Sequence, residues 1–157
     1  MAIAKNFAIG KDGKLPWHYG ADLKFFKEMT IGHAVLMGAN TWRSIGKPLP
    51  GRLNIVLSRR GDIKVPDEVR LVDSKGAALA VAAKLETDLY VIGGAEVFNA
   101  FAGDINKWIV TDVPIDVADA DTFMPANFLD GFEIETRREL GGGLNARFLT
   151  RSRTKLV

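Results

Sequence analysis

The sequence predicts an α/β fold of three layers, in which a mostly parallel central sheet carries helices on both faces and ends in a C-terminal antiparallel hairpin. Two observations favour this class. Short apolar runs alternate with segments of helical periodicity along most of the chain, which indicates parallel strands joined by right-handed crossovers. Close to the carboxyl end, two longer segments flank three consecutive glycines at 141–143, a pattern typical of a hairpin.

The individual elements follow from the same patterns in chain order. Apolar runs bounded by Gly, Pro, Asp or Ser predict buried strands at 1–4, 34–37, 53–57, 69–72, 89–92 and 108–111. Helical spacing predicts helices starting near residue 21 and at 41–45, 74–85 and 96–101. We expect the hairpin strands at 132–138 and 146–153, and irregular loops at 5–18 and 112–125.

Composition limits the domain organisation and the class of partner. The chain has 157 residues, of which 47% are hydrophobic and 25% are charged, which suits a single domain over residues 1–157. Its 21 basic and 19 acidic residues leave a net charge of +2, too balanced to favour nucleic acid or an anionic membrane surface. We therefore expect a small-molecule partner. Separately, we expect a monomer.

The cysteine and histidine content and the first ten residues indicate which cellular compartment to expect. The chain has no cysteine and two histidines, which argues against a disulfide and against a metal site. This composition fits a reducing cytoplasm. Residues 1–10 contain no long apolar run, so we expect neither a signal peptide nor a membrane span.

Asp22 is an acid on a helical face that is otherwise apolar. If a helix begins near residue 21, a step of about 100° per residue places Asp22, Phe26 and Met29 on one stripe and Lys24 and Lys27 on the opposite face. A carboxylate there gains from the unpaired N–H groups of the first turn but loses water, which disfavours its charged form. From this helix alone, a capping or rim acid is the more ordinary interpretation.

Three corners of the predicted sheet carry residues suited to a phosphate. Gly38, Ser58-Arg59-Arg60 and Gly93-Gly94 each follow a predicted strand, at the carboxyl edge where open α/β sheets bind ligands. Bare glycine backbone suits a pyrophosphate, and a guanidinium suits a further phosphate. Each corner alone is more simply a tight turn or a surface charge, whereas the three together favour a phosphate-bearing nucleotide.

Seven short motifs then carry a family resemblance. They are Ile9-Gly10, Leu15-Pro16-Trp17, Ala21-Asp22-Leu23, Thr41-Trp42, Ser44-Ile45-Gly46, Pro48-Leu49-Pro50-Gly51-Arg52-Leu53-Asn54 and Val91-Ile92-Gly93-Gly94. In this order and spacing, from residue 2 through the hairpin, the chain resembles dihydrofolate reductase of the bacterial chromosomal type. The resemblance implies NADPH-dependent reduction of 7,8-dihydrofolate to 5,6,7,8-tetrahydrofolate, and antifolates such as trimethoprim or methotrexate as further ligands.

The resemblance also implies roles for individual residues. Asp22 would bind the pterin and support protonation at N5, Trp17 would hold an ordered water, Thr111 would hydrogen-bond the carboxylate, and Leu15 would lie at the same centre. Arg52 would pair with the α-carboxylate of the glutamate tail. The other substrate-binding residues would be Leu23, Phe26, Lys27, Ile45, Lys47 and Leu49.

NADPH would be held by a longer set of residues. The cofactor-binding residues implied are Ala2, Ile9, Gly10, Gly38, Asn40, Thr41, Ser58, Arg59, Arg60, Gly93, Gly94, Ala95, Glu96, Val97 and Phe98. Residues 9–14 would form a lid over the nicotinamide, and Asp121-Thr122 would latch it, although an ordinary turn would explain the same pair. The resemblance also implies a cis peptide between Gly93 and Gly94.

The sequence departs from the family pattern at several positions. Ala39 stands where relatives often place an arginine against the cofactor phosphates, Phe98 stands where tyrosine is common, and Arg43 replaces a frequent acid. Arg59 and Arg60 are expected to compensate at the 2′-phosphate.

The chain also begins inside the family's first strand, so backbone groups of neighbouring strands are expected to lack partners, at about 1 to 3 kcal/mol for each buried group. Water, another segment, a partner chain or a start assigned too late would each account for this.

Two other functions stay open from the sequence. The pyrimidine reductase of riboflavin synthesis shares the fold, but it should lack the Leu-Pro-Trp and Ala-Asp-Leu motifs found here. A folate- or nucleotide-binding protein without turnover is the alternative from a different class. Oxidation of NADPH on addition of dihydrofolate separates these functions.

Overall fold

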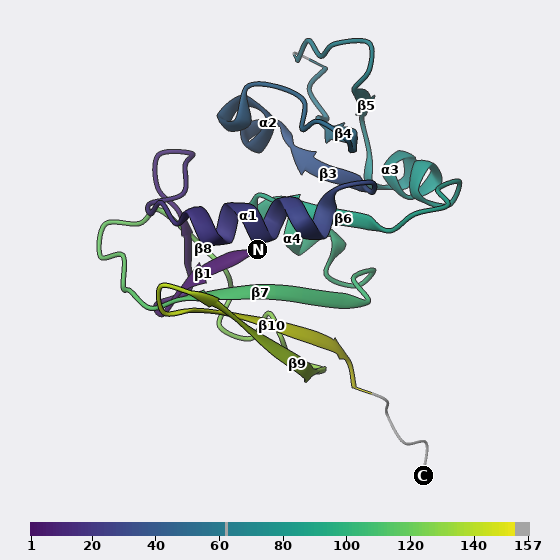
Figure 1. Cartoon of the computed structure of the whole chain (residues 1–157). Coiled ribbons are helices and arrows are strands. Elements are labelled where there is room, and N and C mark those ends of the chain that lie inside the picture. Colours follow the sequence, from purple (N-terminus) through teal and green to yellow (C-terminus); the bar gives the residue numbers. More distant parts are fainter. Residues whose placement is uncertain (62, 153–157) are drawn as a thin grey trace. The chain divides into compact units, whose positions relative to one another are not determined.

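The computed structural model describes residues 1–61 and 63–152, and it contains helices and strands in alternation (Figure 1). The strands are β1 (Ala2–Ala4), β2 (Ala8–Gly10), β3 (Ala34–Gly38), β4 (Leu53–Leu57), β5 (Arg70–Val72), β6 (Leu89–Gly93), β7 (Lys107–Val113), β8 (Thr122–Phe123), β9 (Phe132–Gly141) and β10 (Leu144–Arg151). The helices are α1 (Gly20–Thr30), α2 (Ala39–Ile45), α3 (Lys75–Ala82) and α4 (Ala95–Phe101). The predicted α/β class and the antiparallel C-terminal hairpin are confirmed.

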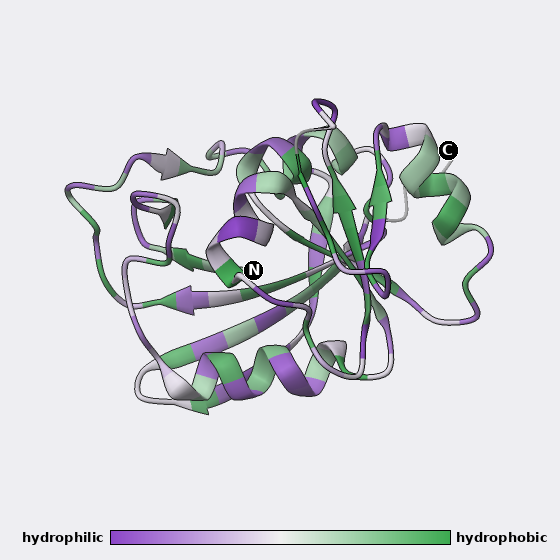
Figure 2. Ribbon diagram, turned by 90° about the horizontal axis from the view of Figure 1, so that it is seen from above, coloured by the Kyte–Doolittle hydropathy of each residue, from purple (hydrophilic) through white to green (hydrophobic). Residues whose placement is uncertain are grey.

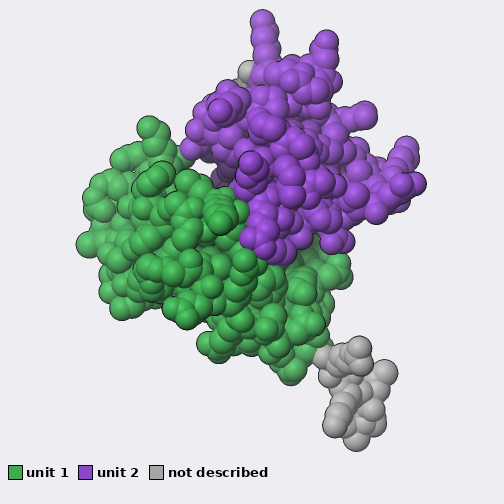
Figure 3. Space-filling view, viewed as in Figure 1, with its two compact units in different colours: residues 1–25, 102–157 green, residues 26–101 purple. Residues whose placement is uncertain are grey.

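The chain divides into two compact units, which Figure 3 colours separately. Unit 1 contains residues 1–25 and 102–157, and unit 2 contains residues 26–101. The boundary falls within α1, between Phe25 and Phe26. The expectation of a single domain over residues 1–157 stays a prediction.

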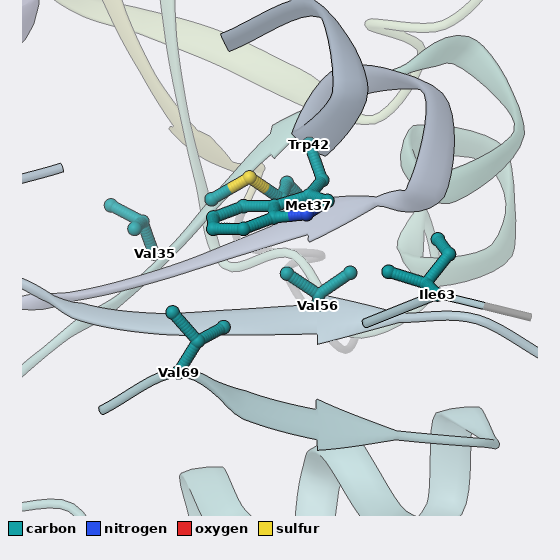
Figure 4. Close-up of a cluster of buried hydrophobic side chains, with 6 residues drawn as sticks. All are labelled: Val35, Met37, Trp42, Val56, Ile63 and Val69. Atoms are coloured by element: carbon teal, nitrogen blue, oxygen red, sulfur yellow. The ribbon is translucent and has the colours of Figure 1, made fainter. Parts of the chain in front are cut away.

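Unit 2 is built on a parallel sheet of four strands in the order β5-β4-β3-β6. All five residues of the central strand β3 are buried. A parallel strand that is covered on both faces needs such a continuous apolar run. One core cluster joins this strand to its neighbours: Trp42 of α2 lies over Met37, and Val35, Val56, Ile63 and Val69 complete the cluster (Figure 4). The sheet therefore aligns the carboxyl ends of β3, β4 and β6.

Unit 1 is built on a mixed sheet in the order β1-β7-β10-β9. β1 runs parallel to β7, and β10 runs antiparallel to both β7 and β9. A bidentate ion pair links two of these strands, because Nε and Nη2 of Arg147 each donate to Asp112 at 2.7 Å. The glycine hairpin is tighter than expected, since β9 continues to Gly141 and only residues 142 and 143 turn.

The main difference from expectation lies in the two segments expected to be irregular. Each contains a short strand, and β2 pairs with β8 in the antiparallel sense. Residues 112 and 113 also extend β7 beyond its expected end. These strands are only two or three residues long and pair across more than a hundred positions, so no local pattern announces them. The expected strand end at Arg153 lies outside the described residues.

Helix α1 is the longest helix and carries hydrophobic and hydrophilic residues side by side (Figure 2). It begins at Gly20, one residue earlier than expected. Helix α3 is shorter than the expected 74–85 because Ser74 caps its first turn, accepting from Ala77 N at 3.2 Å, and the helix ends at Ala82. Within residues 1–61 and 63–152, no helix combines the length and apolar character needed to cross a membrane.

Candidate active site

Asp22 is a buried acid in the first turn of α1. Its exposed fraction is 8%, whereas Lys24 and Lys27 are exposed. One turn further along the buried face, the ring of Phe25 packs edge-on against Phe148 with the centroids 6.0 Å apart. The predicted combination of an acid with an apolar helical face is therefore present, and the acid lies where unpaired helix N–H groups favour negative charge.

The start of the chain lies close enough to Asp22 for their charges to interact. The α-amino group of Met1 is buried and donates to Ile109 O at 2.7 Å. Burial lowers the pKa of this amino group, and the charge of Asp22 partly offsets that effect. Thr111 is 2% exposed in β7, and its N–H donates to Met1 O at 2.8 Å. A hydrogen bond from Thr111 to Asp22 stays a prediction.

Trp17 presents a buried polar atom. Its ring packs against the cluster of Ala4, Ala8 and Val117. The indole Nε1 is buried and has no hydrogen-bond partner among the described residues. A buried N–H without a protein acceptor is usually satisfied by water, which fits the ordered water expected at this position. Leu15, two residues earlier, is 48% exposed.

The loop at residues 11–14 is tied to the acidic segment by side chains and by main chain. The N–H of Asp12 donates to Asp121 Oδ2 at 2.7 Å, and the Thr122 hydroxyl donates to Asp121 Oδ1 at 2.8 Å. In the main chain, the N–H of Asp121 donates to Gly10 O at 3.3 Å. The bonds from the Asp12 N–H and the Thr122 hydroxyl lower the pKa of the Asp121 carboxyl, and the Asp12 N–H makes the largest contribution. The expected contact between Asp121-Thr122 and this loop is therefore present.

A second contact on the same loop, which no sequence pattern predicted, is an ion pair between Lys11 and Asp119. The hydrogen bond within this pair raises the pKa of Lys11 and lowers the pKa of Asp119. Both side chains are exposed, so the pair is screened by salt.

In unit 2, two of the predicted glycine corners meet at adjacent strand ends. Met37 pairs with Gly93 across β3 and β6. A Cβ added at Gly38 would lie 3.8 Å from Gly93 O and 4.0 Å from Gly94 N. The peptide between Gly93 and Gly94 is cis, as expected. The three glycines thus present bare backbone at one place on the carboxyl edge of the sheet.

Other predicted cofactor residues surround this edge. The Thr41 hydroxyl would lie 3.7 Å from a Cβ at Gly93 and 3.6 Å from one at Gly94. Ser58, buried at the end of β4, donates its N–H to Val72 O at 2.9 Å, and the exposed Arg59 and Arg60 follow it. The other predicted cofactor-binding residues of unit 2 are the buried Val97 and Phe98, the half-buried Ala95, and the exposed Asn40 and Glu96.

A polar scaffold also holds the loop that precedes β4. Asn54 is 3% exposed; its amide nitrogen donates to Leu49 O and to Arg52 O, each at 3.0 Å, and its oxygen accepts from Leu49 N at 2.9 Å. Arg52 is half-buried and donates to Thr30 Oγ1 and to Pro50 O. Asn54 belongs to the motif at 48–54 but had no expected role, and no sequence pattern pointed to Thr30.

The remaining predicted substrate residues differ in exposure. Phe26, Ile45 and Leu49 are half-buried, whereas Lys27, Lys47 and Leu23 are exposed, Leu23 to 46%. The exposure of Leu23 departs from the expected apolar stripe, because the residue lies one position beyond Asp22 and turns off the buried face. In unit 1, Ala2 pairs with Thr111, Ile9 is half-buried and Gly10 is buried.

A parallel sheet whose strands end in glycine corners is the arrangement of α/β proteins that bind nucleotides, and this chain adds a buried acid in its other unit. Comparison with known proteins narrows that class. The family model of dihydrofolate reductase matches residues 1–150. The chain therefore belongs to the dihydrofolate reductase family, as its motifs suggested.

Individual relatives agree with this assignment. A dihydrofolate reductase of Haemophilus influenzae is 38% identical over 135 residues, covering 86% of this chain and 82% of the relative. Dihydrofolate reductase HdrB of Haloferax volcanii is 38% identical over 148 residues, covering 88% and 74%. A solved dihydrofolate reductase of Enterococcus faecalis, complexed with NADP(H) and RAB-propyl, superimposes with a TM-score of 0.89 at 30% identity, covering 97% of this chain and 94% of that one.

Proposed function

We propose that this chain reduces 7,8-dihydrofolate to 5,6,7,8-tetrahydrofolate with NADPH. The observation that carries the proposal is Asp22, a buried acid on the apolar face of α1 in a chain of the dihydrofolate reductase family. When bound, NADPH supplies a hydride to C6 of the substrate. The second requirement is a proton at N5, and Asp22 supports that step by binding the pterin ring and steering its protonation.

The other residues of unit 1 assist this acid. Thr111 hydrogen-bonds the Asp22 carboxylate, and Trp17 holds a water through its indole N–H. The orphaned position of that N–H supports the assignment. Leu15 lies on the same loop, where it helps to exclude bulk water from the reacting ring. Asp121 keeps the loop in place through the N–H of Asp12.

The residues of unit 2 fit a dinucleotide that carries phosphates. A Cβ at Gly38 would lie 2.9 Å from Val97 Cγ2 and 3.8 Å from Gly93 O, so glycine lets this corner pack closely against α4 and leaves its main chain bare for a ligand. Thr41 and Ser58 supply hydroxyls, while Arg59 and Arg60 supply charge for a 2′-phosphate. The remaining proposed cofactor contacts are Ala2, Ile9, Gly10, Asn40, Ala95, Glu96, Val97 and Phe98. The solved relative from Enterococcus faecalis holds NADP(H), which supports this assignment.

The substrate's tail is assigned to the loop before β4. The guanidinium of Arg52 pairs with the α-carboxylate, since a planar fork of N–H groups suits that geometry. Apolar contacts come from Leu23, Phe26, Ile45 and Leu49, and further charge from Lys27 and Lys47. We also propose that antifolates such as trimethoprim and methotrexate bind here, and that the protein acts as a cytoplasmic monomer without nucleic-acid or membrane partners.

The test is turnover of dihydrofolate by the purified protein, followed through the absorbance of NADPH. The protein should oxidise NADPH only when dihydrofolate is present. Asp22→Asn keeps the shape and removes the charge, so it should bind NADPH as the parent does and lose a factor on the order of 10² or more in turnover. The loss should shrink with a substrate that is already protonated. A parent protein without turnover contradicts the proposal, and an Asp22→Asn variant that keeps the parent rate contradicts the role of the acid.

A further inference from the structure

The hydroxyl of Thr30 accepts a hydrogen bond from the guanidinium of Arg52 and fixes its orientation. Thr30 is the last residue of α1 and is 2% exposed. Arg52 Nη1 donates to Thr30 Oγ1 at 3.1 Å, and Arg52 Nε donates to Pro50 O at 3.0 Å. The hydroxyl donates its own proton to Phe26 O at 2.8 Å. Its lone pairs are therefore left to accept from the guanidinium.

The main chain joins the two segments independently of this side-chain contact. Gly32 N donates to Gly51 O at 2.8 Å, and Leu53 N donates to His33 O at 3.0 Å. These two bonds involve Gly51 and Leu53, the residues directly before and after Arg52. Removal of the threonine hydroxyl therefore leaves the loop attached to the end of α1 and removes only the side-chain bonds to Arg52 Nη1 and to Phe26 O.

The held guanidinium still has donors for a ligand. An arginine side chain has five N–H donors, and two of them are committed to Thr30 and Pro50. Over the described residues, the other three are left for a carboxylate, which needs two. Burial lowers the pKa of Arg52, but a guanidinium stays protonated in proteins. The side chain is thus charged, oriented and only partly satisfied.

We propose that Thr30 is a positioning residue that sets the affinity for the substrate's carboxylate tail by orienting Arg52. This inference rests on the proposed function, in which Arg52 pairs with the α-carboxylate of dihydrofolate. A mobile arginine side chain loses conformational entropy when it becomes fixed on a ligand. An arginine that is already held in place before binding avoids much of that entropy cost. The hydroxyl makes no contribution to the hydride or proton step, so its effect falls on binding alone.

The test is Thr30→Val, which keeps the volume and the β-branch and removes the hydroxyl. Loss of one hydrogen bond to a charged group should raise KM for dihydrofolate about 3- to 10-fold and leave kcat near the parent value. A 7,8-dihydropterin without the benzoylglutamate tail makes no contact with Arg52. Its KM should therefore be the same for Thr30→Val and the parent.

Three further variants separate positioning from a general structural effect. Thr30→Ser retains the hydroxyl and should restore the parent KM for dihydrofolate. Thr136→Val makes the same change at an exposed position of β9 and should alter neither substrate's KM. In an Arg52→Ala background, Thr30→Val should add no further loss, because its effect passes through the guanidinium.

Two outcomes overturn the proposal at different levels. If the parent reduces dihydrofolate but Thr30→Val leaves its KM unchanged, or raises KM equally for the tailless dihydropterin, the positioning role is wrong and the proposed function stands. If the parent reduces no dihydrofolate, the proposed function fails and this inference fails with it.

Discussion

Gly38→Ala tests whether the glycine corner of unit 2 is a ligand site or an ordinary turn. Gly38 has φ −80° and ψ 170°, a conformation open to alanine, so any effect comes from space and not from backbone strain. The added Cβ would lie 2.9 Å from Val97 Cγ2, well inside ordinary van der Waals contact. Val97 is 7% exposed, so its side chain cannot swing into solvent, and overpacking of this kind costs about 1 to 3 kcal/mol of unfolding free energy.

A second substitution separates packing from binding. Val97→Ala removes the methyl group that the new Cβ would meet, so the double variant should recover much of the stability lost by Gly38→Ala. NADPH affinity should stay below that of Val97→Ala alone if the added Cβ takes space that the cofactor needs beside Gly93 and Gly94, and Val97→Ala alone is the reference because Val97 is itself a proposed cofactor contact. Urea unfolding and a fluorescence titration with NADPH measure the two quantities.

The matched control is Gly76→Ala in α3. A Cβ there meets nothing within 4 Å, and alanine within a helix is favoured over glycine by about 0.5 to 1 kcal/mol. This variant should bind NADPH as the parent does. A Gly38→Ala variant with parent stability and parent affinity for NADPH would refute the argument from space.

Two further predictions concern charge. Replacement of Arg59 and Arg60 by alanine should erode the preference for NADPH over NADH, measured as the ratio of kcat/KM values, and an unchanged ratio would rule out their 2′-phosphate role. Lys11→Met should speed amide hydrogen exchange at the loop to the level that the parent reaches in high salt, because the ion pair with Asp119 is exposed and screened. The raised pKa of Lys11 and the lowered pKa of Asp119 keep both groups charged between at least pH 3.8 and pH 10.5. The parent loop should therefore loosen as pH falls through the lowered pKa of Asp119 or rises through the raised pKa of Lys11. A loop exchange rate that changes with neither Lys11→Met nor salt would contradict the role of the Lys11–Asp119 pair in holding the loop.

The strands of the parallel sheet in unit 2 include several elements that the sequence predicted accurately. β3, β4 and β6 lie within one residue of their expected bounds, because each is a short, mainly apolar run of the kind that parallel strands require. β2 and β8 were missed since their pairing joins distant positions and each strand is too short to show a period. Short strands of this kind depend on tertiary contacts that no local window contains.

The candidate site shows the same division between local and distant signals. Asp22 and the glycines at 93 and 94 stood out because an acid on an apolar face and a glycine pair after a strand are locally unusual. Thr30 is an ordinary residue at a helix end, and its contact with Arg52 joins positions 22 apart. Residues with a locally unusual pattern were thus noticed from the sequence, whereas Thr30, whose contact lies far along the chain, was not.

Burial is a property shared by the residues noticed from the sequence and by the residues that hold others in place. Among the described residues, the buried polar side chains are Asp22, Thr30, Asn54, Ser58 and Thr111. Burying a polar group costs free energy unless its hydrogen bonds are replaced, so a fold that keeps such groups has a use for them or a partner for them. Thr30 and Asn54 have their partners in and around the Arg52 loop, and the other three belong to the proposed catalytic and cofactor sets. The buried polar residues of the two cores therefore belong to, or contact, the residues that the motifs assign to the substrate and the cofactor.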